Sequence, residues 1–473
     1  MQAAGSGPRP TGSPTANPQL AQPAPANPEL EALKRYLRGA RGRLYTGLLP
    51  GGLALTDAQQ ALLVLGPPRS GKTSALAVPN VLCAPGPVIA TSTKLDLMSA
   101  TLGARSGGRR WLLDPTGSVL SDPPGVTRLR WSPVSGASTW DGALLMARSM
   151  TRAARPRGRL GESAHWTERA EALLAPLLHA ASITGAGMDS VARWALRQEL
   201  SPAQTVLATH GTTTASDVLA GIAATDPREQ SGIWSSLAGV LAAYRSDAVL
   251  DNASCENFDP AALPGSNDTI YICAPARQQD LAAPIVVAFL EQVRSAVYAA
   301  HSRDTGLAQL TLVLDEVANI APLPDLPALV SEGGGQGVST IACLQDLSQA
   351  KGRWGQAAEG FLSLFGTKVV LPGIGDMATL ETVSRLAGDI DVPVRSVSHN
   401  PASGGLFGSE TVTWSNQRQR RLPPDAVNQQ PPGCALMLCG AAPPVHLGLP
   451  PWWATVPFSR AVAPVERART LGW

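Results

Sequence analysis

The feature that most constrains this chain is the stretch "LLVLGPPRSGKTSALAVPN" at residues 62–80. Its apolar run is typical of a buried strand, and a helical pattern follows the Gly/Pro-rich loop. Between them, "GPPRSGKT" fits the phosphate-loop pattern G-x-x-x-x-G-K-[ST] without a mismatch. Backbone N–H groups of such a loop and the following helix N-terminus face phosphates. We therefore predict a nucleotide site formed by Gly66, Pro67, Pro68, Arg69, Ser70, Gly71, Lys72 and Thr73.

Within this loop, two side chains have the chemistry to act on a nucleotide. Lys72 is expected to neutralise the β and γ phosphates, and the hydroxyl of Thr73 is expected to ligate Mg²⁺. Far downstream, "LTLVLDEVAN" carries a strand pattern that ends in Asp315 and Glu316. A phosphate-loop enzyme places its metal-side aspartate and a carboxylate for the attacking water at such a strand end. The metal ligands predicted are thus Thr73 and Asp315.

A third polar group follows another apolar run. "VSTIACLQD" ends in Gln345, whose amide could sense the γ-phosphate or hold the attacking water. A glutamine that merely caps the loop is the alternative.

The apolar runs also predict the fold. Continuous runs, of the kind that a parallel sheet buries on both faces, alternate with helical segments and predict a doubly wound α/β sheet. The runs are "ALLVLG", "GPVIATST", "RRWLLDP", "DTIYICAP", "LTLVLDE", "VSTIACLQ" and "TKVVLPG". Residues 137–255 show helical periodicity with almost no strand pattern, which predicts an all-α domain inserted into the core.

These patterns divide the chain into six predicted segments. They are a disordered Pro/Ala-rich arm (1–28), a basic helix (29–44), the first part of the core (45–136), the helical insertion (137–255), the second part of the core (256–450) and a C-terminal tail (451–473). For the basic helix, an ordinary solvated helix face is the alternative reading.

Composition excludes some classes of protein. The net charge of +2 argues against broad nonspecific nucleic-acid binding, so any such contact must be local. The candidate patches are "RSGGRR" (Arg105–Arg110), "ARPRGR" (Arg155–Arg159) and "RQRR" (Arg418–Arg421), although solvated faces would look the same.

The six cysteines lack the spacing of a zinc site. No apolar stretch reaches the length of a membrane span. We therefore expect a cytoplasmic protein that meets the membrane, if at all, peripherally.

The order of the motifs resembles one family. "GPPRSGKTSALAVPN", "VIATSTKLDL", "WLLDPTG", "RWSPVSGASTWDGA", "LTLVLDEVANIAPLPDLPALVSEGGGQG", "LQDLSQAKGRWG" and "RRLPPDAV" resemble type IV secretion coupling proteins, the conjugative ATPases of the VirD4/TraG/TraD family in the FtsK/HerA branch of phosphate-loop motors. The resemblance covers roughly residues 45–450. It implies a RecA-like core with an inserted all-α domain.

What the resemblance implies about function is specific. Members are ring-forming, usually hexameric ATPases that use ATP and Mg²⁺, dock a DNA–protein substrate to a secretion channel and pump DNA, single-stranded and linked to a relaxase. By motif, Asp315 and Glu316 become the hydrolytic acid pair and Gln345 the motif glutamine. Lys94, with Asp96, matches the family's lysine-acid element near the γ-phosphate, for which a surface salt bridge is the alternative.

Two departures from the family are visible. Members usually carry N-terminal transmembrane helices, for which this sequence has no candidate, so membrane contact is expected through partner proteins. Many members have an arginine where this chain reads "SEGGGQG" with Gln336. The arginine that would act on a neighbouring subunit's nucleotide must then come from elsewhere, and Arg277 is the candidate, with Arg385 second.

The leading hypothesis from the sequence is an ATP-driven motor that moves DNA, with attached protein, into a conjugative type IV secretion channel. A chromosome or plasmid translocase of the same branch is one alternative. A nucleotide-gated receptor that docks the relaxase without translocating anything is another.

Overall fold

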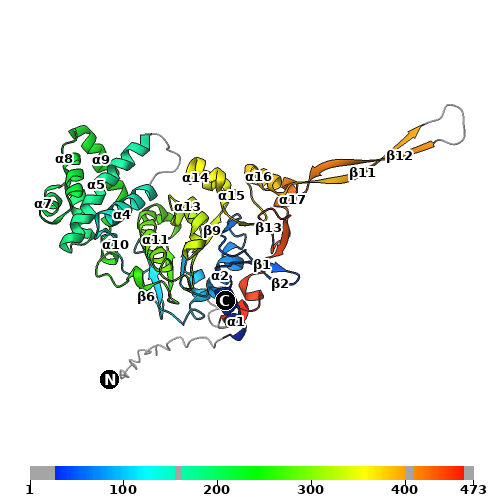
Figure 1. Ribbon diagram of the computed structural model, residues 1–473, viewed down its shortest axis with the longest axis horizontal. Coiled ribbons are helices and arrows are strands. Elements are labelled where there is room, and N and C mark those ends of the chain that lie inside the picture. The colour runs from blue at the N-terminus through cyan, green and yellow to red at the C-terminus, as the bar shows by residue number, and fades with distance from the viewer. Residues whose placement is uncertain (1–26, 155–161, 401–408, 463–473) are drawn as a thin grey trace, which may run out of the picture.

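A twelve-stranded sheet forms the centre of the protein (Figure 1). The computed structural model describes residues 27–154, 162–400 and 409–462. Within that part, the strand order is β2-β1-β14-β13-β10-β3-β9-β8-β4-β7-β5-β6. The predicted fold class is confirmed: an α/β core with a doubly wound, mostly parallel sheet and an inserted set of helices.

The parallel part of the sheet runs from β10 to β6. Its strands are β3 (Leu62–Leu65), β4 (Val88–Ser92), β5 (Arg110–Leu113), β6 (Thr127–Arg128), β7 (Thr269–Cys273), β8 (Leu310–Leu314), β9 (Val338–Leu344) and β10 (Thr367–Val370). Every residue of β3, β4, β7, β8, β9 and β10 is buried. The apolar runs were readable as strands because helices cover both faces of such a sheet.

An antiparallel wing extends the sheet beyond β10. It consists of β1 (Tyr45–Leu49), β2 (Gly52–Leu55), β13 (Cys434–Cys439) and β14 (Val445–Gly448). These strands carry no pattern that predicts them from the sequence. They are short and half exposed, and their pairing joins the two ends of the chain, so no local apolar run marks them.

Helices of the core flank the sheet (Figure 1). They are α1 (Pro28–Gly39), α2 (Val78–Cys83), α3 (Asp96–Thr101), α11 (Gln279–His301), α12 (Val317–Ile320), α13 (Leu326–Glu332), α14 (Leu347–Trp354), α15 (Phe361–Leu364), α16 (Met377–Ala387), α17 (Pro424–Asn428) and α18 (Phe458–Ala461). The predicted basic helix is therefore shorter than residues 29–44, since it ends at Gly39 and β1 begins at Tyr45.

A group of helices stands at one end of the molecule (Figure 1). It comprises α4 (Trp140–Ala153), α5 (Glu162–Thr184), α6 (Met188–Arg197), α7 (Ser201–His210), α8 (Thr213–Ala223), α9 (Pro227–Val240) and α10 (Asp247–Asn252). The long α5 contacts α4, α6, α7, α8 and α9, and α4 also packs on α11 of the core. The described residues between β6 and β7 form no strand. The boundaries 137 and 255 stay predictions.

Helix α11 is the one described helix long and apolar enough to cross a membrane by length and composition. Two thirds of that span (67%) is buried inside the protein. Contacts with α4 and α12 cover much of its surface. It is therefore a core helix here.

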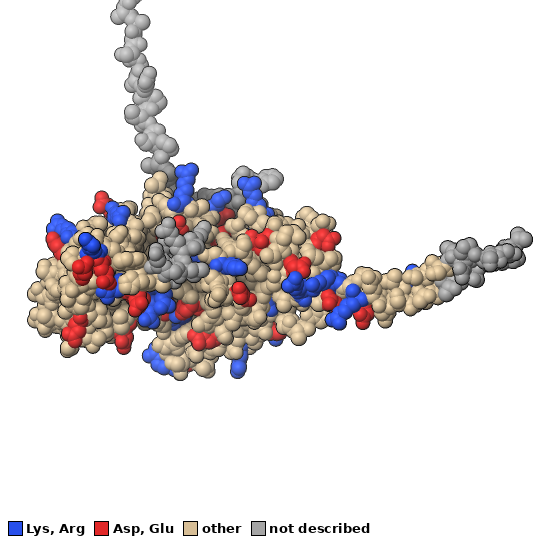
Figure 2. Space-filling view, turned by 90° about the horizontal axis from the view of Figure 1, so that it is seen from above, with Lys and Arg blue, Asp and Glu red and all other residues tan. Residues whose placement is uncertain are grey.

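A long hairpin projects from the core on the side away from the helical insertion (Figure 1). Its strands β11 (Asp389–Asn400) and β12 (Ser409–Arg420) pair only with each other. Ion pairs hold its base: Arg418 contacts Asp389 at 3.2 Å, and Arg420 contacts Glu381 of α16 at 3.7 Å. Basic side chains accordingly gather at this base (Figure 2).

The segment expected as a C-terminal tail packs on the core through residue 462. Trp452 and Phe458 are buried, and the ring of Phe458 packs edge-on against that of Tyr45 in β1. These large apolar side chains join the core cluster on the face of the sheet that α1 and α2 cover. Residues 463–473 lie outside the described part.

The helix after the phosphate loop is tied to the antiparallel wing by Asn80. Its buried side chain accepts a hydrogen bond from the backbone N–H of Tyr45 at 2.9 Å and donates to the carbonyl oxygens of Tyr45 and Leu76, each at 2.9 Å. A buried backbone group that loses its partner is costly. The "VPN" end of the opening stretch thus fixes the loop's helix in place.

Replacing Asn80 by alanine should lower the free energy of unfolding by about 2–3 kcal/mol, because both backbone groups of Tyr45 would lose their partners. Urea unfolding followed by circular dichroism measures this change. Gln356→Ala, at an exposed position, is the control and should shift stability by less than about 0.5 kcal/mol. Equal effects of the two substitutions would contradict the assigned role.

Candidate nucleotide site at the carboxyl edge of the sheet

The carboxyl edge of the parallel strands brings the predicted site residues together. In the sheet, β9 lies between β3 and β8, and β4 lies beside β8. The phosphate loop follows β3, Gln345 follows β9, Asp315 follows β8 and Lys94 follows β4. The N–H of Gly66 donates to the carbonyl of Leu344 at 3.1 Å, which joins the loop to the end of β9. Ligands of open α/β sheets bind at this edge.

The loop itself has an unusual backbone. Arg69 has a φ of 64° and Gly71 a φ of 95°, both in the left-handed region. At Gly66, a Cβ atom would lie 2.8 Å from Oγ of Ser70 and 3.0 Å from Cβ of Leu371, so any larger residue would crowd the loop. Left-handed backbone at a non-glycine residue such as Arg69 is strained and concentrates at functional sites. The loop is thus built to turn sharply around its own N–H groups.

Lys72 points back into the loop. Its Nζ donates to the carbonyl oxygens of Gly66 at 2.6 Å and Pro67 at 2.9 Å, and the residue is 6% exposed. Carbonyl oxygens carry only partial negative charge, so a phosphate would be a stronger partner for this ammonium group. The arrangement places a cation in the loop that phosphates would enter.

Thr73 and Asp315 are in direct contact. The hydroxyl of Thr73 donates to Oδ2 of Asp315 at 2.7 Å, and the hydroxyl of Thr91 in β4 donates to the backbone carbonyl of Asp315 at 2.8 Å. Asp315 is 7% exposed. Burial raises the pKa of this carboxyl above its ordinary value, whereas the Thr73 hydrogen bond and the charge of Lys72 oppose that rise.

Glu316 adopts left-handed backbone, with φ 53° and ψ 46°, at the start of α12. Its Oε2 accepts a hydrogen bond from Nδ2 of Asn319 at 3.1 Å. This geometry turns the chain sharply after β8 and leaves Glu316 half-buried beside the buried Asp315. Asn319 was not predicted from the sequence, although an amide one helical turn after the acid pair was a usable signal.

Gln345 lies between the phosphate loop and the acid pair because β9 lies between β3 and β8. Its backbone N–H donates to Oε1 of Gln349 in α14 at 2.9 Å, and the residue is half-buried. Gln349 therefore fixes the turn, and the side chain of Gln345 is not needed to cap it.

The remaining predicted residues are exposed. Lys94 and Asp96 are exposed after β4, and no salt bridge among the described residues joins them. Arg277 is exposed just after β7, two strands from β8. Arg385 lies on α16 and pairs with Glu381 at 3.2 Å.

The residues present suit Mg²⁺ bound together with a nucleotide. Among described residues, no group of three or more His, Cys, Asp or Glu could hold a metal alone. Mg²⁺ usually takes one or two protein oxygens together with phosphate oxygens and waters, and Thr73 with Asp315 offers such a pair. The hydroxyl of Ser70, buried in the loop without a hydrogen-bond partner, also fits a missing polar ligand.

Comparison with known proteins identifies relatives of this architecture. The family described as "Type IV secretory system Conjugative DNA transfer" matches residues 31–470. The bacterial conjugative coupling protein TrwBdeltaN70, in its unbound monoclinic form, is 20% identical with a TM-score of 0.68, over 89% of this chain and 91% of that chain. No curated protein sequence matches the chain.

Two further structures of TrwB carry nucleotides. The complex with the non-hydrolysable ATP analogue ADPNP is 18% identical with a TM-score of 0.64, over 89% of this chain and 92% of that chain. The complex with ADP and Mg²⁺ is 19% identical with a TM-score of 0.64, over the same shares of the two chains. At these low sequence identities, the structural matches show that the fold is shared.

Replacing Asp315 by asparagine should stabilise the nucleotide-free protein by about 1 kcal/mol at pH 7, because it removes a desolvated charge from a functional site. The raised pKa of Asp315 means that the folded state binds its proton more tightly than the unfolded state does. The difference in the free energy of unfolding between Asp315→Asn and the wild type should therefore shrink as the pH falls from 7 to 5. Urea unfolding at both pH values measures it. A destabilised Asp315→Asn protein, or a gap that widens at pH 5, would contradict this account.

Proposed function

The chain belongs to the type IV secretory system conjugative DNA transfer family, and we propose that it is an ATP-driven motor that couples a DNA substrate to a type IV secretion channel. The observation that carries the proposal is the 2.7 Å hydrogen bond between Thr73 and Asp315. It joins the phosphate loop to the acid pair across 242 positions of sequence. Only a folded phosphate-loop core brings these two groups together.

In this proposal, Thr73 and Asp315 hold Mg²⁺, and Lys72 leaves the carbonyls of Gly66 and Pro67 to contact the β and γ phosphates of ATP. Bound Mg²⁺ neutralises charge on the phosphates that the reaction transfers. The N–H groups of Gly66–Thr73 cradle the phosphates. Support comes from the left-handed loop backbone and from the relatives of the same fold that hold ADPNP, or ADP with Mg²⁺.

Glu316 is the proposed general base. Its carboxylate accepts a proton from water as the water oxygen bonds to the γ-phosphorus, and the bond to the β–γ bridging oxygen breaks to release ADP. Gln345, between the loop and the acids, is proposed to orient this water. Asn319 holds one oxygen of Glu316, which leaves the other oxygen for the water.

The proposal includes a ring of identical subunits, with six as the expected number. Arg277, exposed at the same edge of the sheet, is proposed to contact the nucleotide of the neighbouring subunit, and Lys94 is proposed to face the γ-phosphate. The partners are DNA, single-stranded and carrying a relaxase, and channel or membrane proteins of the secretion system. We place the protein in the cytoplasm, at the inner face of the membrane through such partners.

Glu316→Gln should lower ATP turnover by about 100-fold or more with little loss of nucleotide affinity, because the amide cannot accept the proton.

Lys72→Ala should lose affinity for ATP, since it removes the charge that faces the phosphates. Both are measured by phosphate release and by binding of a fluorescent ATP analogue, with single- and double-stranded DNA present or absent. Glu359→Gln, at an exposed position, is the control. The proposed motor function would be overturned if Glu316→Gln left ATP turnover unchanged. It would also be overturned if DNA did not change the turnover of the assembled wild-type ring.

One observation favours a second candidate, a nucleotide-gated receptor that docks the DNA–protein substrate without moving it. The turn Gly333–Gln336 before β9 contains no cation, whereas motor relatives often have an arginine there. A receptor would bind ATP with negligible turnover in the wild type and in Glu316→Gln alike. Wild-type turnover that DNA raises, and that Arg277→Ala removes, would exclude it.

A further inference from the structure

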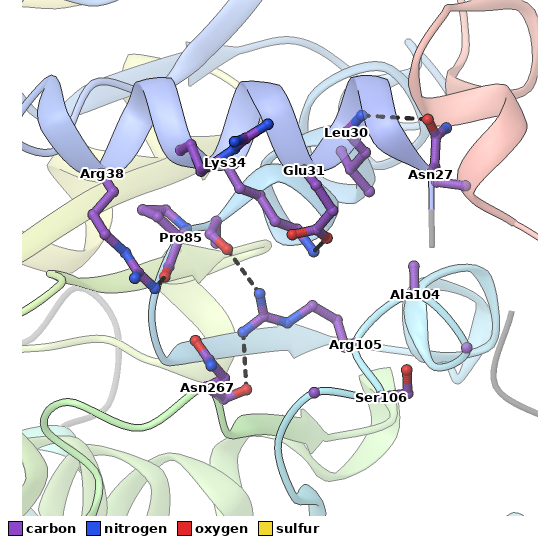
Figure 3. Close-up of a pocket in the computed structure, with 15 residues that line it drawn as sticks. Asn27, Leu30, Glu31, Lys34, Arg38, Pro85, Ala104, Arg105, Ser106 and Asn267 are labelled. Carbon is purple, nitrogen blue, oxygen red and sulfur yellow. Dashed lines mark hydrogen bonds and ion pairs between the residues drawn. The ribbon is translucent and has the colours of Figure 1, made fainter. Parts of the chain in front are cut away.

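A basic groove lies beneath α1, at the amino edge of the parallel strands and so across the sheet from the phosphate loop. Two cavities of about 330 and 500 Å³ form it, and they share Arg38 and Pro85 as walls. The loop before β4 and the segment around residue 105 make its floor (Figure 3). The two cavities adjoin along α1 where Arg38 donates to the carbonyl oxygen of Pro85 at 2.8 Å.

The charge of the groove has one dominant sign. Its basic lining residues are Lys34, Arg35, Arg38, Arg41, Arg43 and Arg105. Glu31 is the only acidic residue among the lining, and it pairs with Lys34 at 2.9 Å. Low-dielectric walls of a cleft focus such a field. The groove is therefore complementary to an anion that extends over several positions.

Arg105 makes the floor of the groove permanently positive. It is 5% exposed, and its guanidinium donates to the carbonyl oxygens of Ala84 at 2.8 Å and Gly86 at 2.7 Å. It also donates to the carbonyl oxygen of Asn267 at 3.1 Å (Figure 3). No carboxylate among the described residues forms a salt bridge with it. The "RSGGRR" segment, expected as a surface patch, thus contributes a buried cation under the groove.

The basic side of α1 faces the groove, where Arg38 reaches across to the backbone of Pro85 (Figure 3). Leu30 and Leu37 are buried against the core, so the helix has no free apolar face for insertion into a bilayer. Arg35, Arg38 and Arg41 remain exposed along the rim. Residues 1–26 of this chain contain no aspartate or glutamate and cannot neutralise the groove.

We propose that this groove binds the phosphate backbone of a single DNA strand without reading its sequence. The inference rests on the proposed function in one respect, that DNA is the substrate. The exposed cations along the rim, Arg35, Arg38 and Arg41, offer partners to phosphates, and backbone contacts carry no sequence information. No Phe, Tyr or Trp lines the groove and His301 is its one ring, so stacking contributes little and the affinity depends steeply on salt.

The test is charge reversal at the rim, Arg35→Glu with Arg38→Glu, in the full-length chain. Anisotropy of a fluorescent oligothymidylate measures affinity across a range of salt concentrations. We expect at least a tenfold loss of affinity at low salt and a slope of log K against log salt that is shallower by about 1–2. Arg193→Glu with Arg197→Glu on α6 is the matched control, exposed and equally altered in charge, and should bind like the wild type.

The outcomes separate the groove from the proposed function. Unchanged affinity and slope in the double reversal would overturn the groove while leaving the DNA motor intact. A wild-type chain without affinity for any oligonucleotide would overturn both. If the double reversal keeps its affinity for the oligonucleotide but no longer binds vesicles of anionic phospholipid, the groove is a membrane contact and the proposal of a DNA site is overturned. An unchanged thermal midpoint shows that the variant is folded, and Arg35→Gln with Arg38→Gln should give an intermediate loss.

Discussion

The contact between Thr73 and Asp315 is the constraint on which the rest of the structure depends. The two groups are joined at 2.7 Å only because β3 and β8 lie one strand apart with their carboxyl ends at the same edge. The intervening strand is β9, which places Gln345 between them. The helical insertion emerges between β6 and β7, at the far side of the parallel strands, where it leaves this edge undisturbed.

The same edge concentrates the unfavourable features of the fold. Asp315 is a desolvated carboxyl, and Arg69 and Glu316 both hold left-handed backbone. Each feature costs free energy that the rest of the protein must offset. The strands behind the edge do so, since every residue of β3, β8 and β9 is buried and apolar packing dominates there. Rigid strands thus hold a strained site in a single arrangement.

The sequence predicted what local patterns can reveal. The apolar runs located the parallel strands except the two-residue β6, and the motifs located Lys72, Thr73, Asp315 and Gln345 at one edge. It could not predict features that arise from pairing between distant segments: β1 with β14, the hydrogen bonds of Asn80 to Tyr45, or Arg105 beneath α1. The packed Trp452 was missed for the same reason, because its partners lie at the other end of the chain.

The β11–β12 hairpin leaves and re-enters the core at one point, since its first residue, Asp389, pairs directly with its last, Arg420. The described cross-strand pairs beyond that point join no other strand. Adding or removing cross-strand pairs would change the reach of the arm by about 3.3 Å per residue, without moving a single core side chain. The length of this hairpin can therefore change in evolution independently of the α/β core that carries it.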